Sequence, residues 1–169
     1  MPPQSNMLAT DVKYHNDGSA TAAGVLFAAW SDHAPRRVFT VPIARVEDYE
    51  SGSFYKRELP CLQALLGVVD ADVRIIVVDG YVDLGEKPGL GRYLYNALQG
   101  TTAVVGVAKR SFRDAGGRAV YRADSTRPLH VTAAGMPLDE AARCVAAMHG
   151  AHRMPTLLRR VDALSRGHT

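Results

Sequence analysis

The sequence is poor in cysteine, which excludes two kinds of small stabilised scaffold. Its two cysteines, Cys61 and Cys144, lie far apart and form no Cys-x-x-Cys pair. A disulfide framework or a zinc ribbon needs more cysteines at closer spacing. A chain of 169 residues needs no such staple, because a chain of about this length buries about 70% of its unfolded surface. We therefore expect a single globular domain over residues 1–169, in a reducing compartment.

Long apolar runs are also missing, which argues against a membrane partner. The most apolar stretch, residues 20–30, has about 11 residues, whereas a membrane-spanning helix takes about 20. Residues 1–6 contain neither a basic segment nor an apolar one, so no signal peptide is expected. We expect a soluble, cytoplasmic protein.

Charge of one sign is not in large excess. Twenty lysines and arginines stand against 17 acidic residues, so the formal net charge is +3. Such a balance permits a nucleic-acid partner without requiring one. Composition therefore leaves open an enzyme, a binding protein and an inactive relative of either.

The apolar pattern at the start of the chain predicts antiparallel strands. Residues 8–14 alternate between two faces, and Asn16-Asp17-Gly18 is a turn signal. Residues 20–30 and 37–43 continue as strands, which makes three in succession. A helix is expected over residues 53–68, with Pro60 either kinking or starting it.

The middle of the chain predicts parallel strands. Residues 73–80 and 103–108 are continuous apolar runs, typical of strands buried on both faces of a parallel sheet. Further strands are expected at 118–122 and 129–132, a short helix before Leu98, and helices after Pro137 and over 157–164. The expected fold class is α/β: a mixed sheet with antiparallel first strands, then parallel strands, flanked by helices.

Three acidic residues and one lysine are candidates for chemistry. Asp11 lies within a strand, where aspartate is depleted, and Glu58 lies at the expected helix entry. Asp79 and Lys109 end the two apolar strands. If the strands of Asp11 and Asp79 are neighbours, these acids converge at the carboxyl edge of the sheet, where α/β folds place their sites.

Carboxylates gathered in this way suit a hard divalent ion. Mg²⁺ or Mn²⁺ prefers oxygen ligands and assists the hydrolysis of phosphate esters, and Lys109 can neutralise a phosphate. Each residue also has a simpler explanation. Asp11 can be a surface residue paired with Lys13, Glu58 a surface charge, Asp79 part of an Asp-Gly turn, and Lys109 a solvated lysine.

Around these residues the sequence resembles the endonuclease V family. Residues 10–14 (TDVKY) are similar to the family's Asp-Val-x-Tyr, and residues 49–60 (YESGSFYKRELP) to its Tyr-Ile-Pro-Gly and Phe-Arg-Glu-x-Pro segment. Residues 77–80 (VVDG) are similar to Val-Asp-Gly, and residues 105–109 (VGVAK) to Ile-Gly-Val-Ala-Lys. Residues 150–155 (GAHRMP) are similar to Gly-Tyr-Arg-x-Pro. These matches follow the family's order from Asp11 to about Pro155.

The resemblance implies a ribonuclease H-like fold and a metal-dependent DNA-repair endonuclease. Such an enzyme hydrolyses a phosphodiester bond 3′ to a deaminated base, inosine, in DNA or RNA. The resemblance implies that Asp11, Glu58 and Asp79 hold Mg²⁺ or Mn²⁺ and that Lys109 assists near the scissile phosphate.

The resemblance also implies residues for recognition of the substrate. Tyr49 would belong to a wedge that separates the strands, and Gly52 and Gly80 would line the pocket of the flipped base. Extrusion suits a damaged base, which costs less to unstack. The implied partner is nucleic acid, and we expect the protein to be a monomer.

Three segments depart from the family's pattern. After Asp-Gly the family usually has His/Gln-Gly-x-Ala-His-Pro-Arg, whereas residues 81–88 are YVDLGEKP, without histidine. The family's late Gly-His, near the metal, is Gly135-Met136 here. The wedge carries Asp48 and Glu50, which repel phosphate.

These departures leave two alternatives open. One is a diverged nuclease that acts on single-stranded or branched nucleic acid without inosine specificity. The other is a non-catalytic nucleic-acid-binding protein that keeps the fold.

Overall fold

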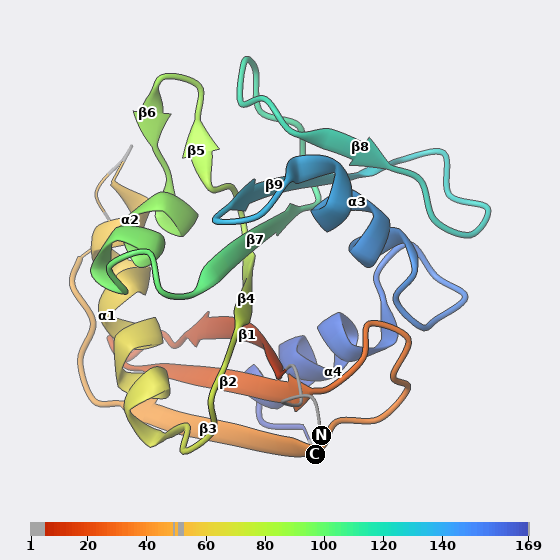
Figure 1. Ribbon diagram of the computed structural model, residues 1–169. Helices are drawn as coiled ribbons and strands as arrows, with labels where there is room; N and C mark the ends of the chain where they lie inside the picture. The colour runs from red at the N-terminus through yellow and green to blue at the C-terminus, as the bar shows by residue number, and fades with distance from the viewer. Residues whose placement is uncertain (1–5, 49, 51–52, 169) are drawn as a thin grey trace.

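A mixed sheet of seven strands runs through the molecule in the order β3-β2-β1-β4-β7-β9-β8 (Figure 1). The computed structural model describes residues 6–48, 50 and 53–168. The strands of the sheet are β1 (Met7–Tyr14), β2 (Ala20–Phe27), β3 (Arg37–Ile43), β4 (Ile75–Asp79), β7 (Ala103–Ala108), β8 (Arg118–Val120) and β9 (Leu129–Ala134).

The directions of the strands confirm the expected mixed sheet. β1, β2 and β3 pair antiparallel, and β1, β4 and β7 pair parallel at the centre. β9 and β8 then add antiparallel pairs at the far edge. The parallel strands are those with continuous apolar runs, because side chains on both of their faces are buried.

Helices cover both faces of the sheet (Figure 1). Helices α1 (Phe54–Val68) and α2 (Leu90–Ala97) pack on one face, where Leu65 and Leu94 are fully buried. Helices α3 (Leu138–Ala146) and α4 (Thr156–Ser165) pack on the other face. No helix within the described part of the chain is long and apolar enough to cross a membrane.

Two local expectations are refined. Helix α1 begins at Phe54 and contains Pro60, so the alternative that Pro60 starts the helix is wrong. Residues 83–88, for which the sequence patterns predict neither helix nor strand, form a small hairpin of β5 (Asp83–Leu84) and β6 (Lys87–Pro88). Strands of two residues are too short to produce a periodic sequence pattern.

A buried arginine organises the connection between α3 and α4. Arg122 is 5% exposed, and its guanidinium donates hydrogen bonds to backbone carbonyls alone among the contacts that the structure describes. The acceptors are the carbonyls of Val145, Ala146, Met148, Gly150, His152 and Arg153, at 3.0–3.4 Å. Two of these carbonyls, those of Val145 and Ala146, lie in the last turn of α3, where a helix no longer supplies the usual N–H four residues further on. Arg122 therefore fixes the turn that delivers α4 to the sheet.

Replacing Arg122 with methionine should destabilise the fold. The buried carbonyls would lose their donors, and we expect the free energy of unfolding to fall by about 2–4 kcal/mol. Urea denaturation followed by circular dichroism measures this change. Arg127 is exposed, so Arg127→Met should change the free energy by less than about 0.5 kcal/mol. Equal effects of the two substitutions would contradict this role of Arg122.

Candidate active site at the carboxyl edge of the sheet

The pairing of β1 with β4 brings Asp11 and Asp79 together. The parallel ladder ends where Ala9 pairs with Val77, and the two aspartates lie two residues further along each strand. The hydroxyl of Thr10 donates to the Val77 carbonyl oxygen at 2.8 Å and joins the strands where they begin to separate. The predicted convergence of the two acids is confirmed, because both line one cavity.

This cavity combines acidic and apolar walls. Its volume of about 30 Å³ accommodates at least one water molecule or ion, since a water needs about 10–15 Å³ on this measure. Asp11, Asp79, Asp162 and Lys109 supply its charged groups. The apolar lining residues are Val77, Val78, Val107, Met154, Leu158 and Val161. Charges in such a setting interact more strongly than they do in water.

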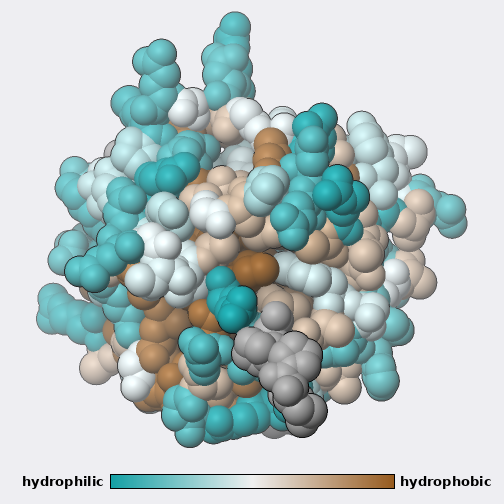
Figure 2. Space-filling model, viewed as in Figure 1, coloured by the Kyte–Doolittle hydropathy of each residue, from teal (hydrophilic) through white to brown (hydrophobic). Residues whose placement is uncertain are grey.

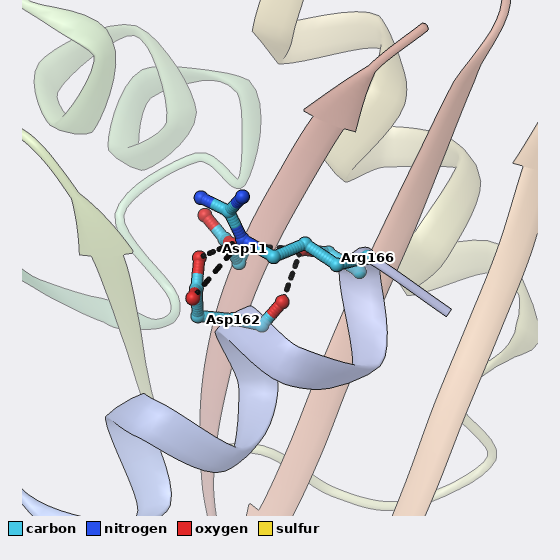
Figure 3. Close-up of polar contacts among 4 residues, drawn as sticks. Asp11, Asp162 and Arg166 are labelled. Atoms are coloured by element: carbon cyan, nitrogen blue, oxygen red, sulfur yellow. Dashed lines mark hydrogen bonds and ion pairs between the residues drawn. The ribbon is translucent and has the colours of Figure 1, made fainter. Parts of the chain in front are cut away.

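Helix α4 contributes two polar residues that the sequence patterns did not identify (Figure 3). Asp162 lines the cavity, and the hydroxyl of Ser165 donates to Asp11 Oδ2 at 2.8 Å. Arg166 Nε lies 3.2 Å from both carboxylate oxygens of Asp162. The available signal was a serine on the buried face of α4, at helical spacing from Leu158 and Val161. The alternative in which Asp11 is a surface residue paired with Lys13 is not supported.

Glu58 lies within helix α1. Its side chain is 6% exposed, so the alternative of a surface charge is wrong. Its Oε1 accepts a hydrogen bond from the Tyr14 hydroxyl at 3.2 Å. The guanidinium carbon of Arg57 lies over the Tyr14 ring, 3.7 Å from the ring centroid. Glu58 is not among the residues that line the cavity of Asp11 and Asp79.

Burial, and to a smaller extent repulsion between the acidic groups, raises their pKa values. Burial raises the pKa of Glu58 to about 8, with smaller contributions from the charges of Asp79 and Asp11. Burial raises the pKa of Asp11 to about 6; the Ser165 hydrogen bond opposes this rise and the charge of Asp79 adds to it. Asp79 is exposed at the end of β4, but the surrounding protein partly desolvates its carboxyl group and raises its pKa, against the lowering effect of Lys109. Ionisation of these carboxyl groups is therefore less favourable than it is in water.

The donor set fits a divalent ion in its chemistry, although its ligands are not yet gathered. Carboxylate oxygens are the ligands that Mg²⁺ and Mn²⁺ prefer. Within the described residues, however, no three acidic, histidine or cysteine side chains are close enough to ligate one ion. Binding of one ion by three of them would require these side chains to come closer together.

A second hollow lies beside Gly80. It has a volume of about 170 Å³ and is lined by Phe54, Tyr55, Gly80, Tyr81, Leu84, Pro88, Gly89 and Leu90. Gly80 has φ of +137°, a conformation that favours glycine. The segment after it crosses β7 closely, because a Cβ on Gly106 would lie 2.5 Å from the Gly80 carbonyl oxygen. Tyr49 and Gly52, the other residues predicted for recognition, lie outside the described residues.

Gly135 and Met136 lie away from the acidic site. β9 runs antiparallel to β7 and pairs Ala134 with Val104, at the end of β7 opposite Lys109. Met136 packs against the apolar cluster beneath α3 and α4. The expectation that this dipeptide lies by the metal is therefore wrong for this chain, and its lack of histidine removes nothing from the cavity of Asp11 and Asp79.

Solved structures match this architecture over nearly the whole chain. Endonuclease V from Ciona intestinalis, solved with a 24mer DNA containing an inosine followed by a ribo-adenosine, superposes with a TM-score of 0.82. That match covers 96% of this chain and 84% of the other, at 18% identity. The chain has the fold of endonuclease V.

Two further endonuclease V structures agree. The protein from Streptomyces avermitilis matches at 26% identity and a TM-score of 0.77, over 98% of this chain and 82% of that one. The human protein matches at 20% identity and a TM-score of 0.79, over 98% of this chain and 84% of that one. No protein-family model matches the sequence, and no curated protein sequence matches it significantly. The resemblance first stated on short motifs is thus confirmed by the arrangement of the whole chain.

The raised pKa of Glu58 predicts a stability that falls as pH rises. Its pKa is about 8 in the folded protein against an ordinary 4.5, so between these values the unfolded chain binds fewer protons. The free energy of unfolding therefore decreases from about pH 4.5 to pH 8. Without divalent ions, we expect Glu58→Gln to remove on the order of 3 kcal/mol of this loss.

Urea denaturation at pH 5 and at pH 8, with a chelator present, tests this expectation. Glu86 is exposed on the hairpin, and Glu86→Gln should keep the pH dependence of the wild type. An equally steep decline in Glu58→Gln would show that other groups cause it.

Proposed function

We propose that this protein is a metal-dependent endonuclease that hydrolyses a phosphodiester bond 3′ to a deaminated base in DNA or RNA. The observation that carries the proposal is the cavity shared by Asp11, Asp79, Asp162 and Lys109. It lies on a fold that has been solved with inosine-containing DNA in the Ciona protein.

Asp11 and Asp79 would hold Mg²⁺ or Mn²⁺, with Glu58 as the third predicted ligand and Asp162 beside them. A bound divalent ion supplies activation of water and neutralisation of phosphate charge. Glu58 would have to turn toward the cavity, away from the Tyr14 hydroxyl that it accepts from. A bound divalent ion would favour the ionised form of these carboxyl groups.

Lys109 would act on the phosphate itself. It is exposed at the end of β7, and its ammonium group can neutralise charge that develops on the scissile phosphate. Its backbone is held in place, since Arg153 donates to its carbonyl oxygen and also to that of Pro128. The lysine is thus presented at the mouth of the cavity from a fixed backbone.

The hollow beside Gly80 would receive the extruded base. Tyr55 forms part of its wall and stacks on Tyr93, with ring centroids 3.7 Å apart. An apolar, aromatic wall suits a flipped base, which is held by stacking as well as by hydrogen bonds. Gly80 directly follows Asp79, so base and scissile phosphate would bind at neighbouring points.

Basic residues beside the site would hold the nucleic-acid backbone. The loop between β7 and β8 begins with Lys109 and carries Arg110 and Arg113. This loop and the β5–β6 hairpin project from the body of the molecule (Figure 1). In the same view, the space-filling surface of the projecting tips is hydrophilic (Figure 2). Of the two acids in the wedge segment, Glu50 is paired with Lys56 at 3.0 Å. That pairing reduces the repulsion expected between this segment and phosphate.

Cleavage of an inosine-containing oligonucleotide tests the proposal. With Mg²⁺ or Mn²⁺ we expect one cut on the 3′ side of inosine, and no cut when a chelator is added. Asp79→Asn should lower the rate by about 100-fold or more, since metal stabilisation of the transition state is worth several kcal/mol. Asp124 is exposed on the β8–β9 connection, so Asp124→Asn is the matched control. Absence of cleavage by the folded wild-type protein would refute the activity.

A relaxed substrate preference is the second candidate, favoured by the β5–β6 hairpin. This hairpin brings Leu84 and Pro88 to the rim of the hollow beside Gly80, where the family has a different segment. A panel of inosine-containing, unmodified single-stranded and branched substrates separates the two candidates. We expect the inosine-containing substrate to be cleaved at least about tenfold faster than the unmodified substrates, which is a modest preference for a binding pocket. Equal rates on all substrates would favour the diverged nuclease.

A further inference from the structure

Ser165 is a buried hydroxyl between α4 and β1 that no step above requires. Only 1% of the surface of Ser165 is exposed. Its Oγ lies 2.8 Å from Asp11 Oδ2 and also 2.8 Å from the Asp162 carbonyl oxygen. Figure 3 shows this turn of α4 facing Asp11.

The two contacts of Ser165 are not equivalent. A serine hydroxyl has one proton and donates to one acceptor at a time. A hydrogen bond to the carbonyl three residues earlier is a common arrangement for serine in a helix. A carboxylate is the stronger acceptor, so an ionised Asp11 takes the proton.

This contact restricts how Asp11 can face an ion. The backbone of Asp11 is fixed by its pairing with Ala23 in β2, and Oδ2 is occupied by Ser165. With the backbone and Oδ2 both held, the orientation of the carboxylate is fixed, and so is the direction in which its free lone pairs point. Partners of this kind orient metal ligands and set the affinity for the metal.

We propose that Ser165 is a positioning residue for the divalent ion of this site. The proposal rests on the proposed function, because it requires that Asp11 binds the ion. Ser165 follows Asp162 by three residues, so one turn of α4 places both an acid at the cavity and the hydroxyl that orients another acid. Helix α4 is then part of the site and not merely a cover for the sheet.

Titration with Mn²⁺, followed by calorimetry or by electron paramagnetic resonance, measures the effect without an activity assay. Ser165→Ala keeps a good helix former and removes the hydroxyl. We expect the dissociation constant for Mn²⁺ to rise about 10- to 100-fold. In an Asp11→Asn background, Ser165→Ala should add no further loss, since the two residues act through one contact.

Ala163→Gly is the matched control for loosening of the helix. Glycine destabilises the same turn of α4 but leaves the hydroxyl of Ser165 in place. Its melting temperature should fall, whereas its Mn²⁺ affinity should stay within about twofold of the wild type, because the Asp11 contact is retained. Equal losses of affinity in Ala163→Gly and Ser165→Ala would assign the effect to helix docking and overturn the proposal.

The same titrations separate this proposal from the proposed function. If the wild type binds Mn²⁺, Asp79→Asn does not, and Ser165→Ala binds like the wild type, only the role of Ser165 is refuted. If the wild type itself does not bind Mn²⁺, both the metal dependence and the role of Ser165 are refuted.

Discussion

The parallel pairing of β1 with β4 is the contact on which the rest of the site depends. It lasts for three residue pairs and ends at Ala9 and Val77. Beyond that point the strands separate, and the space between them becomes the acidic cavity. A longer ladder would close this space, and a register shifted by one residue would turn Asp11 to the opposite face.

The fold accepts an electrostatic cost at this point. Burial and mutual repulsion raise the pKa values of Asp11, Glu58 and Asp79, so ionising them opposes folding when no ion is bound. The cost is offset by interactions elsewhere, such as the apolar layers on both faces of the sheet and the hydrogen bonds of Arg122. Binding sites commonly carry local destabilisation that the remainder of the structure supports.

Short-range patterns predicted the fold better than they predicted the site. Continuous apolar runs identified β4 and β7 as central strands, and they also located Asp79 and Lys109 at the carboxyl edge. Ser165 and Asp162 were missed because their roles depend on where α4 docks. Helical spacing places Ser165 on the buried face of α4 but does not show which residues that face contacts. Met136 was misplaced because its position follows from the antiparallel direction of β9, which the motif alone did not reveal.

The proposed catalytic and recognition sites rest on different kinds of structure in this molecule. Asp11 and Asp79 are held by the central strands, and Asp162 is held by a helix that Arg122 and Arg153 fix in place. The hollow beside Gly80 is bounded instead by the start of α1 and by the β5–β6 hairpin. Connections tolerate changes of sequence and length that strands and packed helices do not. Residues 81–88, which depart from the family pattern, are such a connection, so their divergence alters the walls of the proposed recognition hollow while the acids keep their positions.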